Sequence, residues 1–166
     1  MTTPLHVAVV TETFPPEVNG VAMTLGRMVQ GLLAGGHRVS LVRPCQHAAD
    51  ADDVTAVSPR LATTRVRGLP IPGYAGLKFG LPAPRLLRRL WRNDRPDVVQ
   101  VVAEGPLGAS AIAAVRDLGI PVVSEFHTNF HAYTRDYGFA WLEGIVAAPL
   151  RRLHNRSRMT LVPSRQ

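Results

Sequence analysis

The feature that most constrains the fold is an apolar run near the start of the chain, residues 5–10, which reads Leu-His-Val-Ala-Val-Val. A short run rich in valine is typical of a parallel β-strand that is covered on both faces. Apolar residues at helical spacing follow over residues 21–34, and Gly35-Gly36 predicts a helix C-cap. A second strand is expected at residues 38–42, before Pro44. Strand, helix and strand in this order predict a βαβ unit.

The same alternation continues along the chain. Further strands are expected at residues 64–69, 97–102, 121–126 and 159–162, and further helices at residues 84–92, 108–118 and 140–154. Residues 46–62 are polar and rich in alanine, and we interpret them as a surface excursion. Residues 70–84 are rich in proline and glycine and predict a long loop. The sequence therefore predicts an α/β fold with a doubly wound, parallel, Rossmann-like sheet and helices on both of its faces.

Composition narrows the classes of protein that remain. The chain has 166 residues, of which 46% are apolar, enough for one globular domain. A single cysteine, Cys45, excludes an internal disulfide. No secretory signal and no apolar run of about 20 residues is visible, so we expect a cytoplasmic protein. The net charge of +7 indicates an anionic partner such as nucleic acid, a lipid surface or a phosphorylated substrate.

Polar loops that follow two of the strands predict where a ligand binds. In an open parallel sheet, ligands lie beyond the carboxyl ends of the strands, where the strand order reverses. The loop after the first strand carries Glu12 and brings Asn19-Gly20 to the start of a helix, where free N–H groups suit a phosphate. The alternative is an ordinary turn in which Asn19 is the N-cap. Glu104 follows the fourth strand and either binds sugar hydroxyls or is a solvated acid.

The loop after the fifth strand combines histidine, amide and aromatic side chains, which suit a polar ligand such as a sugar. The residues that carry this hypothesis are His127, Asn129 and Tyr133. A structural histidine is the alternative at position 127. His127 and His131 stand four residues apart, but no third metal ligand is evident, so we expect no metal site.

Residues 84–92 predict a basic amphipathic helix. Its arginines, Arg85, Arg88, Arg89 and Arg92, fall on one face, while leucines and Trp91 fall on the other. A helix of this kind can lie on an anionic membrane surface. In the alternative, the apolar face packs on the sheet and the arginines are only solvated.

Six motifs, in order and spread over the whole chain, resemble the N-terminal domain of family-4-type retaining glycosyltransferases. The resemblance is to the branch of GDP-mannose-dependent α-mannosyltransferases and sulfolipid synthases. The motifs are ETFPPEVNGV (residues 12–21), GHRV (36–39), RPDVV (95–99), GPLG (105–108), FHTNF (126–130) with Tyr133 and Tyr137-Gly138, and LVPS (161–164). The chain departs from the pattern at Gln100, where the family more usually has histidine.

The resemblance implies a two-domain enzyme of the GT-B type in which residues 1–166 form the acceptor-side, Rossmann-like domain. The donor-binding domain, with its pair of glutamates eight residues apart, would lie outside this chain, where no two glutamates have that spacing. We therefore expect no sugar transfer by this chain alone. The implied reaction transfers a hexose, with mannose expected, from a nucleotide sugar to a lipid or glycan acceptor with retention.

The resemblance also implies roles for individual residues. His127 would be the catalytic residue that touches the donor sugar, while Asn19, Gly20 and Val21 would lie beside the donor diphosphate. Contacts with the acceptor or the sugar would come from Glu12, Glu104, Asn129 and Tyr133. No metal and no cofactor other than the donor are implied, and no nucleic acid partner; attachment to the inner face of an anionic membrane is a further hypothesis.

Two alternatives from other classes stay open. The first is a non-catalytic basic domain that binds anionic lipid or nucleic acid, because of the positive charge. The second is an NADP-dependent Rossmann enzyme in which Arg43, at the end of the second strand, meets the 2′-phosphate. The glycine fingerprint G-x-G-x-x-G is missing from the chain, which weakens the second alternative.

Overall fold

The computed structural model describes residues 3–46, 59–71, 74–102, 105–125 and 159–161. Six strands of the described part form one sheet in the order β3-β2-β1-β6-β7-β8, and every neighbouring pair is parallel. They are β1 (His6–Val10), β2 (Arg38–Pro44), β3 (Leu61–Val66), β6 (Val98–Val101), β7 (Val122–Glu125) and β8 (Met159–Leu161). The prediction of a parallel α/β sheet is confirmed.

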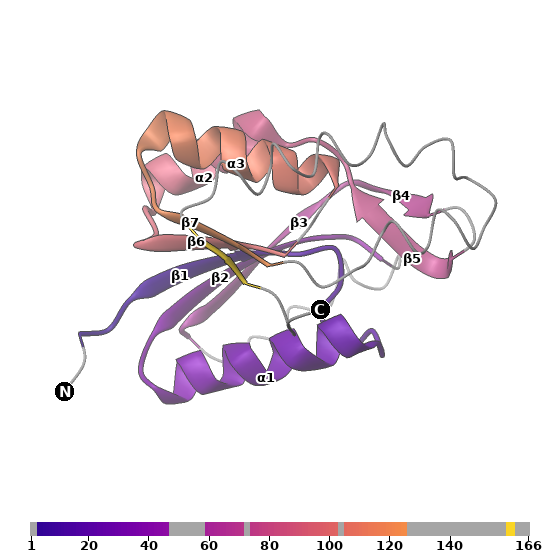
Figure 1. The fold of residues 1–166 in the computed structure, drawn as a ribbon, viewed down its shortest axis with the longest axis horizontal. Coiled ribbons are helices and arrows are strands. Elements are labelled where there is room, and N and C mark those ends of the chain that lie inside the picture. Colours follow the sequence, from indigo (N-terminus) through magenta and orange to yellow (C-terminus); the bar gives the residue numbers. More distant parts are fainter. Residues whose placement is uncertain (1–2, 47–58, 72–73, 103–104, 126–158, 162–166) are drawn as a thin grey trace.

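Three helices of the described residues cover the two faces of this sheet. Helix α1 (Gly20–Ala34) lies on one face, and α2 (Pro84–Asn93) and α3 (Pro106–Leu118) lie on the other (Figure 1). The strand order reverses between β1 and β6, so the loops after these two strands diverge to opposite faces. Such a reversal is where ligands bind in open α/β sheets.

The alternation of side chains along β1 explains why helices are needed on both faces. Val7 and Val9 pack with Leu25 and Val29 of α1, whereas Ala8 and Val10 belong to the core under α2 and α3. Successive side chains of a strand point to opposite faces, so a strand with apolar side chains on both faces must be covered on both. All five residues of β1 are buried.

A two-stranded hairpin replaces the long loop that the sequence predicts after residue 70. Strand β4 (Gly68–Ile71) pairs antiparallel with β5 (Tyr74–Gly80), and the hairpin lies beyond the carboxyl ends of the central strands (Figure 1). The prediction of a loop over residues 70–84 is therefore wrong. The strand predicted at residues 64–69 spans two elements, because β3 ends at Val66 and β4 begins at Gly68.

Gly80 allows the end of the hairpin to lie against α3. A Cβ at this position would be 2.6 Å from Cδ2 and 2.9 Å from Cβ of Leu107, which is shorter than atoms can approach. Leu107 is itself fully buried. Glycine at position 80 is thus required by the close approach of β5 to the first turn of α3.

The predicted surface excursion at residues 46–62 is wrong at both of its ends. Gln46 is 3% exposed and is hydrogen bonded, and residues 61 and 62 belong to β3. Residues 47–58 lie outside the described residues, and so does the helix predicted at residues 140–154.

The amino ends of the strands are joined by a polar network. The backbone N–H of His6 donates to Oδ2 of Asp97 at 2.7 Å, and the His6 ring lies 2.6 Å from the Ser40 hydroxyl. The Arg38 guanidinium donates to both carboxylate oxygens of Asp94, which lowers the pKa of that carboxyl. These bonds fix the strands relative to one another at the end of the sheet opposite the hairpin.

Candidate functional site

The loop after β1 is shaped by side chains that bond to the loop itself. The Thr11 hydroxyl donates to the backbone oxygen of Thr13 at 2.8 Å, and the Asn19 amide donates to the Thr13 hydroxyl at 2.8 Å. Asn19 is also the N-cap of α1, since its Oδ1 accepts the backbone N–H of Ala22 at 2.9 Å. The N-cap that the sequence predicted as one of two alternatives is therefore present.

The first turn of α1 has two backbone N–H groups without a partner in the described residues, next to space that no described atom fills. The N–H groups of Ala22 and Met23 are bonded to Asn19, whereas those of Gly20 and Val21 have no hydrogen-bond partner in the described part of the chain. A Cβ on Gly20 would meet no atom within 4 Å. Free N–H groups and the positive end of a 15-residue helix together suit an anion.

A buried ion pair holds this loop against β2. Arg43 donates through Nη1 to Oε1 of Glu17 at 3.1 Å, and the two side chains are only 4% and 7% exposed. Glu17 also accepts the backbone N–H of Phe14 at 2.8 Å. Arg43 is thus enclosed with a carboxylate, and the alternative in which it meets a cofactor phosphate is not supported. Sequence reasoning missed this pair, because nothing in the spacing of residues 17 and 43 signals a contact.

Glu12 lies where β1, the hairpin and α3 meet. Its Oε2 accepts the backbone N–H of Gly80 at 2.5 Å, and its Oε1 is buried with no hydrogen-bond partner in the described residues. A Cβ on Gly105, the N-cap of α3, would lie 3.0 Å from Oε1. Burial raises the pKa of this carboxyl to about 7, although the Gly80 N–H acts in the opposite direction. A sugar hydroxyl would reach Oε1 only if the hairpin or the start of α3 moved.

Gln46 connects the same region to the residues after β2. Its side-chain amide donates to the backbone oxygens of Glu12, at 2.7 Å, and Lys78, at 3.0 Å. Its Oε1 accepts the backbone N–H of Lys78 at 2.6 Å. The Gln46 side chain therefore pairs with β5 as a neighbouring strand would. No sequence signal identified it, since a single glutamine at the start of a polar segment has no distinctive pattern.

The carboxyl ends of β6 and β7 carry a second buried polar pair. Gln100 donates a short hydrogen bond to Oε1 of Glu125, and its amide nitrogen lies 3.3 Å from Sδ of Met28 in α1. Gln100 and Glu125 are both buried. The position at which the chain departs from the family pattern is thus bonded within the core of the sheet.

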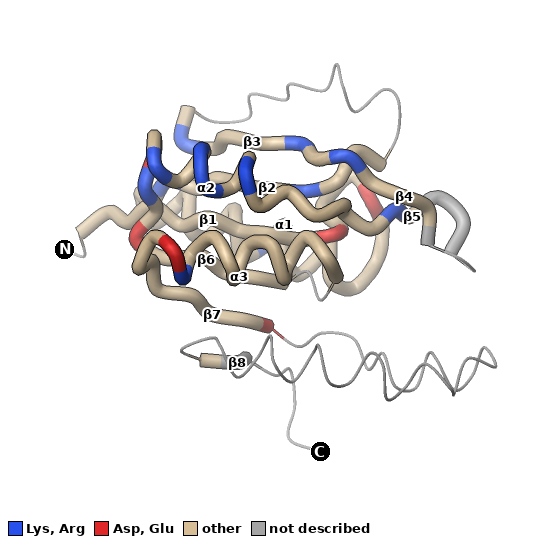
Figure 2. Tube along the Cα trace, turned by 90° about the horizontal axis from the view of Figure 1, so that it is seen from above, with Lys and Arg blue, Asp and Glu red and all other residues tan. Residues whose placement is uncertain are grey.

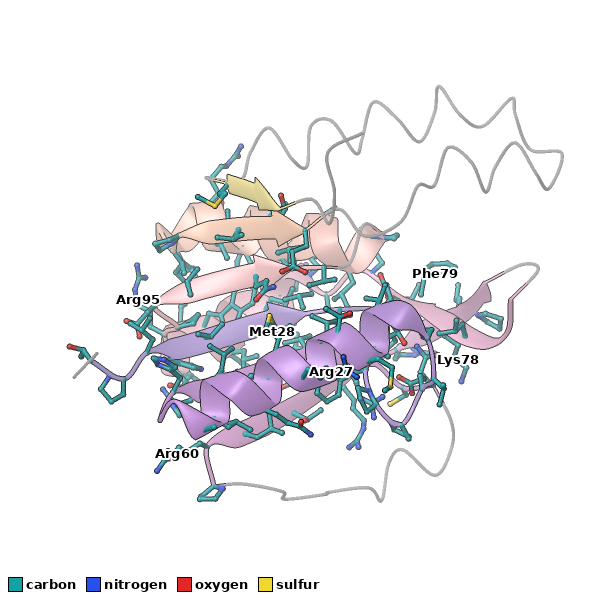
Figure 3. The ribbon with its side chains drawn as sticks, turned by 60° about the horizontal axis from the view of Figure 1, so that its bottom comes forward. Arg27, Met28, Arg60, Lys78, Phe79 and Arg95 are labelled. Carbon is teal, nitrogen blue, oxygen red and sulfur yellow. The ribbon has the colours of Figure 1, made fainter. Side chains whose placement is uncertain are left out.

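The hairpin and the start of α1 lie at the same end of the molecule. In Figure 3, Lys78 and Phe79 lie on the hairpin at this end, and Arg60 and Arg95 lie at the opposite end. The predicted site residues Glu12, Asn19, Gly20 and Val21 are therefore brought together at the carboxyl ends of the strands. Four others lie outside the described residues: Glu104, His127, Asn129 and Tyr133. The described residues contain no group of three or more His, Cys, Asp and Glu side chains that could hold a metal ion.

Helix α2 has the amphipathic character that the sequence predicts, and its apolar face is packed. Leu87 and Trp91 are buried in the core, and Leu86 and Leu90 pack against it. Three arginines are exposed, Arg85, Arg89 and Arg92, while Arg88 donates through Nε to Oδ2 of Asp117 in α3 at 2.7 Å. Figure 2 shows basic residues along α2. A membrane could therefore meet the arginines but not the leucines. No helix in the described ranges has the length and apolar character needed to cross a membrane.

Comparison with known proteins places these features in a family. Residues 18–166 match the model of Glycosyltransferase Family 4. The chain is 32% identical over 160 residues to a GDP-mannose-dependent alpha-mannosyltransferase of Mycolicibacterium smegmatis, covering 96% of this chain and 42% of that protein. It thus spans about two fifths of the length of this relative.

Two further relatives match a smaller share of this chain. The sulfoquinovosyl transferase SQD2 of Arabidopsis thaliana is 31% identical over 99 residues, or 59% of this chain and 19% of that protein. The alpha-monoglucosyldiacylglycerol synthase of Acholeplasma laidlawii is 26% identical over 132 residues, or 78% and 31%. Among solved structures, Arabidopsis thaliana UGT89C1 complexed with UDP-L-rhamnose superposes with a TM-score of 0.59 at 14% identity, over 98% of this chain and 46% of that one. This likeness concerns the fold alone.

Proposed function

The chain belongs to Glycosyltransferase Family 4, and we propose that it is the acceptor-side domain of a retaining mannosyltransferase. The reaction would transfer mannose from a nucleotide sugar, GDP-mannose in the mycobacterial relative, to a lipid or glycan acceptor. The observation that carries this proposal is the pair of free N–H groups at Gly20 and Val21, next to the strand reversal. The expectation of a lipid acceptor is supported by the diacylglycerol in the name of the Acholeplasma relative.

The proposed chemistry follows from the start of α1. A nucleotide diphosphate that lies against Gly20 and Val21 would accept hydrogen bonds from their backbone N–H groups. The positive end of the helix would stabilise the negative charge that develops on the leaving diphosphate. Asn19 positions these groups, because its side chain fixes both the first turn of the helix and Thr13. His127 would touch the donor sugar, and Asn129, Tyr133 and Glu104 would contact the sugar or the acceptor.

Transfer assays test the proposal on the complete polypeptide that carries this sequence. Labelled GDP-mannose, UDP-glucose and UDP-sulfoquinovose would each be supplied with a lipid extract, and the product's anomeric configuration would be determined by NMR. We expect labelled product from GDP-mannose with the α configuration kept. A product with inverted configuration, or turnover of none of the three donors, would contradict the proposal.

We also propose that the arginines of α2 bind an anionic membrane surface, which would bring the active site to a lipid acceptor. Arg85, Arg89 and Arg92 are exposed on one helix, and a basic residue near an anionic leaflet contributes about 1 kcal/mol. This attraction is electrostatic and requires no insertion of the packed leucines.

Sedimentation with phosphatidylglycerol vesicles tests the membrane proposal. Arg89→Glu should weaken binding about tenfold or more, because a charge near the surface is reversed. Arg27→Glu is the matched control, since Arg27 is exposed on α1, across the sheet from α2, and the change in net charge is the same. Equal loss in both variants, or binding to neutral vesicles that equals binding to anionic ones, would reject a role for α2.

A further inference from the structure

The Glu12 side chain lies where three separate elements meet at the carboxyl end of β1. It follows β1 directly, it accepts the backbone N–H of Gly80 at the end of the hairpin, and its other oxygen faces Gly105 at the start of α3. The backbone oxygen of Glu12 is held as well, by the amide of Gln46, which also bonds to Lys78 of β5. The hairpin is therefore attached to the sheet by a group that can gain or lose a proton.

The two protonation states of this carboxyl are not equivalent in the arrangement observed. Protonated Glu12 keeps a carbonyl oxygen that accepts the Gly80 N–H and buries no charge. Ionised Glu12 also accepts that bond, but its Oε1 is then a buried charged atom that no donor in the described residues satisfies. An unsatisfied buried charge is costly, so ionisation favours any movement that admits water to Oε1.

Among the described residues, the charged groups near the junction do not remove this cost. In β5 the charged residue is Lys78. In β2 they are Arg38, which pairs with Asp94 at the amino end of the sheet, and Arg43, which pairs with Glu17 of the loop after β1. In α3 they are Arg116 and Asp117, at the far end of the helix. The shift in the pKa of Glu12 accordingly comes from burial and from the Gly80 N–H, and not from a neighbouring charge.

We propose that Glu12 is a positioning residue which, while protonated, holds the β4–β5 hairpin against β1 and the start of α3, and which loosens this attachment when it ionises. The proton passes to solvent, and the hairpin or the first turn of α3 moves enough for water to reach Oε1. Burial raises the pKa of Glu12 to about 7, which places this change close to neutral pH. The inference concerns the titration of Glu12 and the attachment of the hairpin, so it does not depend on the proposed function.

NMR spectroscopy of the 166-residue chain tests the inference without any transfer activity. The Cδ resonance of Glu12 and the amide resonance of Gly80 would be followed from pH 4 to pH 9, together with hydrogen exchange at Gly80. We expect both resonances to titrate together with a midpoint near 7. Protection of the Gly80 amide, after correction for the pH dependence of intrinsic exchange, should fall about tenfold or more across this midpoint.

Variants separate positioning from a merely structural role. Glu12→Gln keeps an acceptor for Gly80 and carries no charge, so it should retain protection of Gly80 and abolish the titration. Asp117→Asn, a change of an exposed carboxylate in α3, is the control that should leave both unchanged. A Glu12 midpoint near 4.5, or a Gly80 titration that persists in Glu12→Gln, would overturn the inference. The titration of the unaltered chain decides the question even if Glu12→Gln does not fold.

Discussion

Replacing Gly20 by alanine tests the proposed phosphate site with little risk to the fold. Gly20 begins α1 with a backbone that any residue can adopt, and an added Cβ meets no atom within 4 Å. Gly31 in the same helix has the same property and lies three turns further along, away from the carboxyl ends of the strands. Gly31→Ala is therefore a matched control in which the same methyl group is added to the same helix.

The structure gives different magnitudes for stability and for binding. Neither methyl group meets an obstacle, so neither variant should lose stability, and Gly31→Ala should gain about 0.5–1 kcal/mol because alanine favours a helix interior. A methyl group on Gly20 would stand among the free N–H groups and keep a diphosphate from approaching them. Loss of one charge-assisted hydrogen bond costs about 1.5–3 kcal/mol, or roughly ten- to a hundredfold in affinity.

The assay is steady-state transfer by the complete polypeptide, with the nucleotide sugar varied, combined with calorimetric titration of GDP. We expect Gly20→Ala to raise the KM for the donor and the Kd for GDP by that factor, while its thermal unfolding is unchanged. Gly31→Ala should match the unaltered enzyme in both constants. Normal donor affinity in Gly20→Ala, or an equal loss in Gly31→Ala, would refute the placement of the diphosphate at the start of α1.

Three further predictions concern the supports of the site. Arg43→Met should lower the free energy of unfolding in urea by about 3–5 kcal/mol, because Glu17 is left buried without its cation; adding Glu17→Gln should restore part of the loss, and no recovery would show that the pair is not coupled. Gly80→Ala should cost about 1–3 kcal/mol by its clash with Leu107, measured as a fall in Tm, and an unchanged Tm would mean that Leu107 can turn away. Between its ordinary pKa of 4.5 and about 7, Glu12 binds more protons in the folded chain than in the unfolded chain. The free energy of unfolding should therefore fall as pH rises through this range, by at most about 3 kcal/mol. Glu12→Gln should remove this dependence on pH, and a rise in the free energy of unfolding with pH would contradict the buried arrangement.

The parts of the fold that were predictable from sequence are those with an unbroken apolar period. The valine-rich β1 must be buried on both faces, and its pattern predicted a strand that differs from the observed one by a single residue. Helix α1, with its asparagine N-cap, and β2 were predictable for the same reason. The hairpin was missed because its proline and glycine residues are typical of loops, and pairing between two short strands is a tertiary effect.

The candidate site was predictable in place but not in detail. The carboxyl ends of parallel strands meet at one edge, so Glu12 and Asn19 could be placed there from the order of elements alone. Sequence could not show that the Glu12 carboxyl turns inward, because Gly80 and Gly105 come from elements that are distant in the chain. Gln46 was missed for the same reason, since its three bonds join backbone groups on two other segments.

The central place of β1 in the sheet has a consequence for synthesis on the ribosome. One edge of β1 pairs with β2, which follows it by a single helix. The other edge must wait for β6, because Val7 pairs there with Val98, far along the chain. At about 5–20 residues per second, this edge waits on the order of 5–20 s after β1 has been made. During that time the nascent chain presents an unpaired strand bearing Val7 and Val9, which is a template for wrong pairing with other chains. Helix α1 packs on one face of β1 and leaves the hydrogen-bonding edge of the strand unpaired. The time for which this edge stays unpaired is therefore set by the rate at which residues 98–101 emerge from the ribosome.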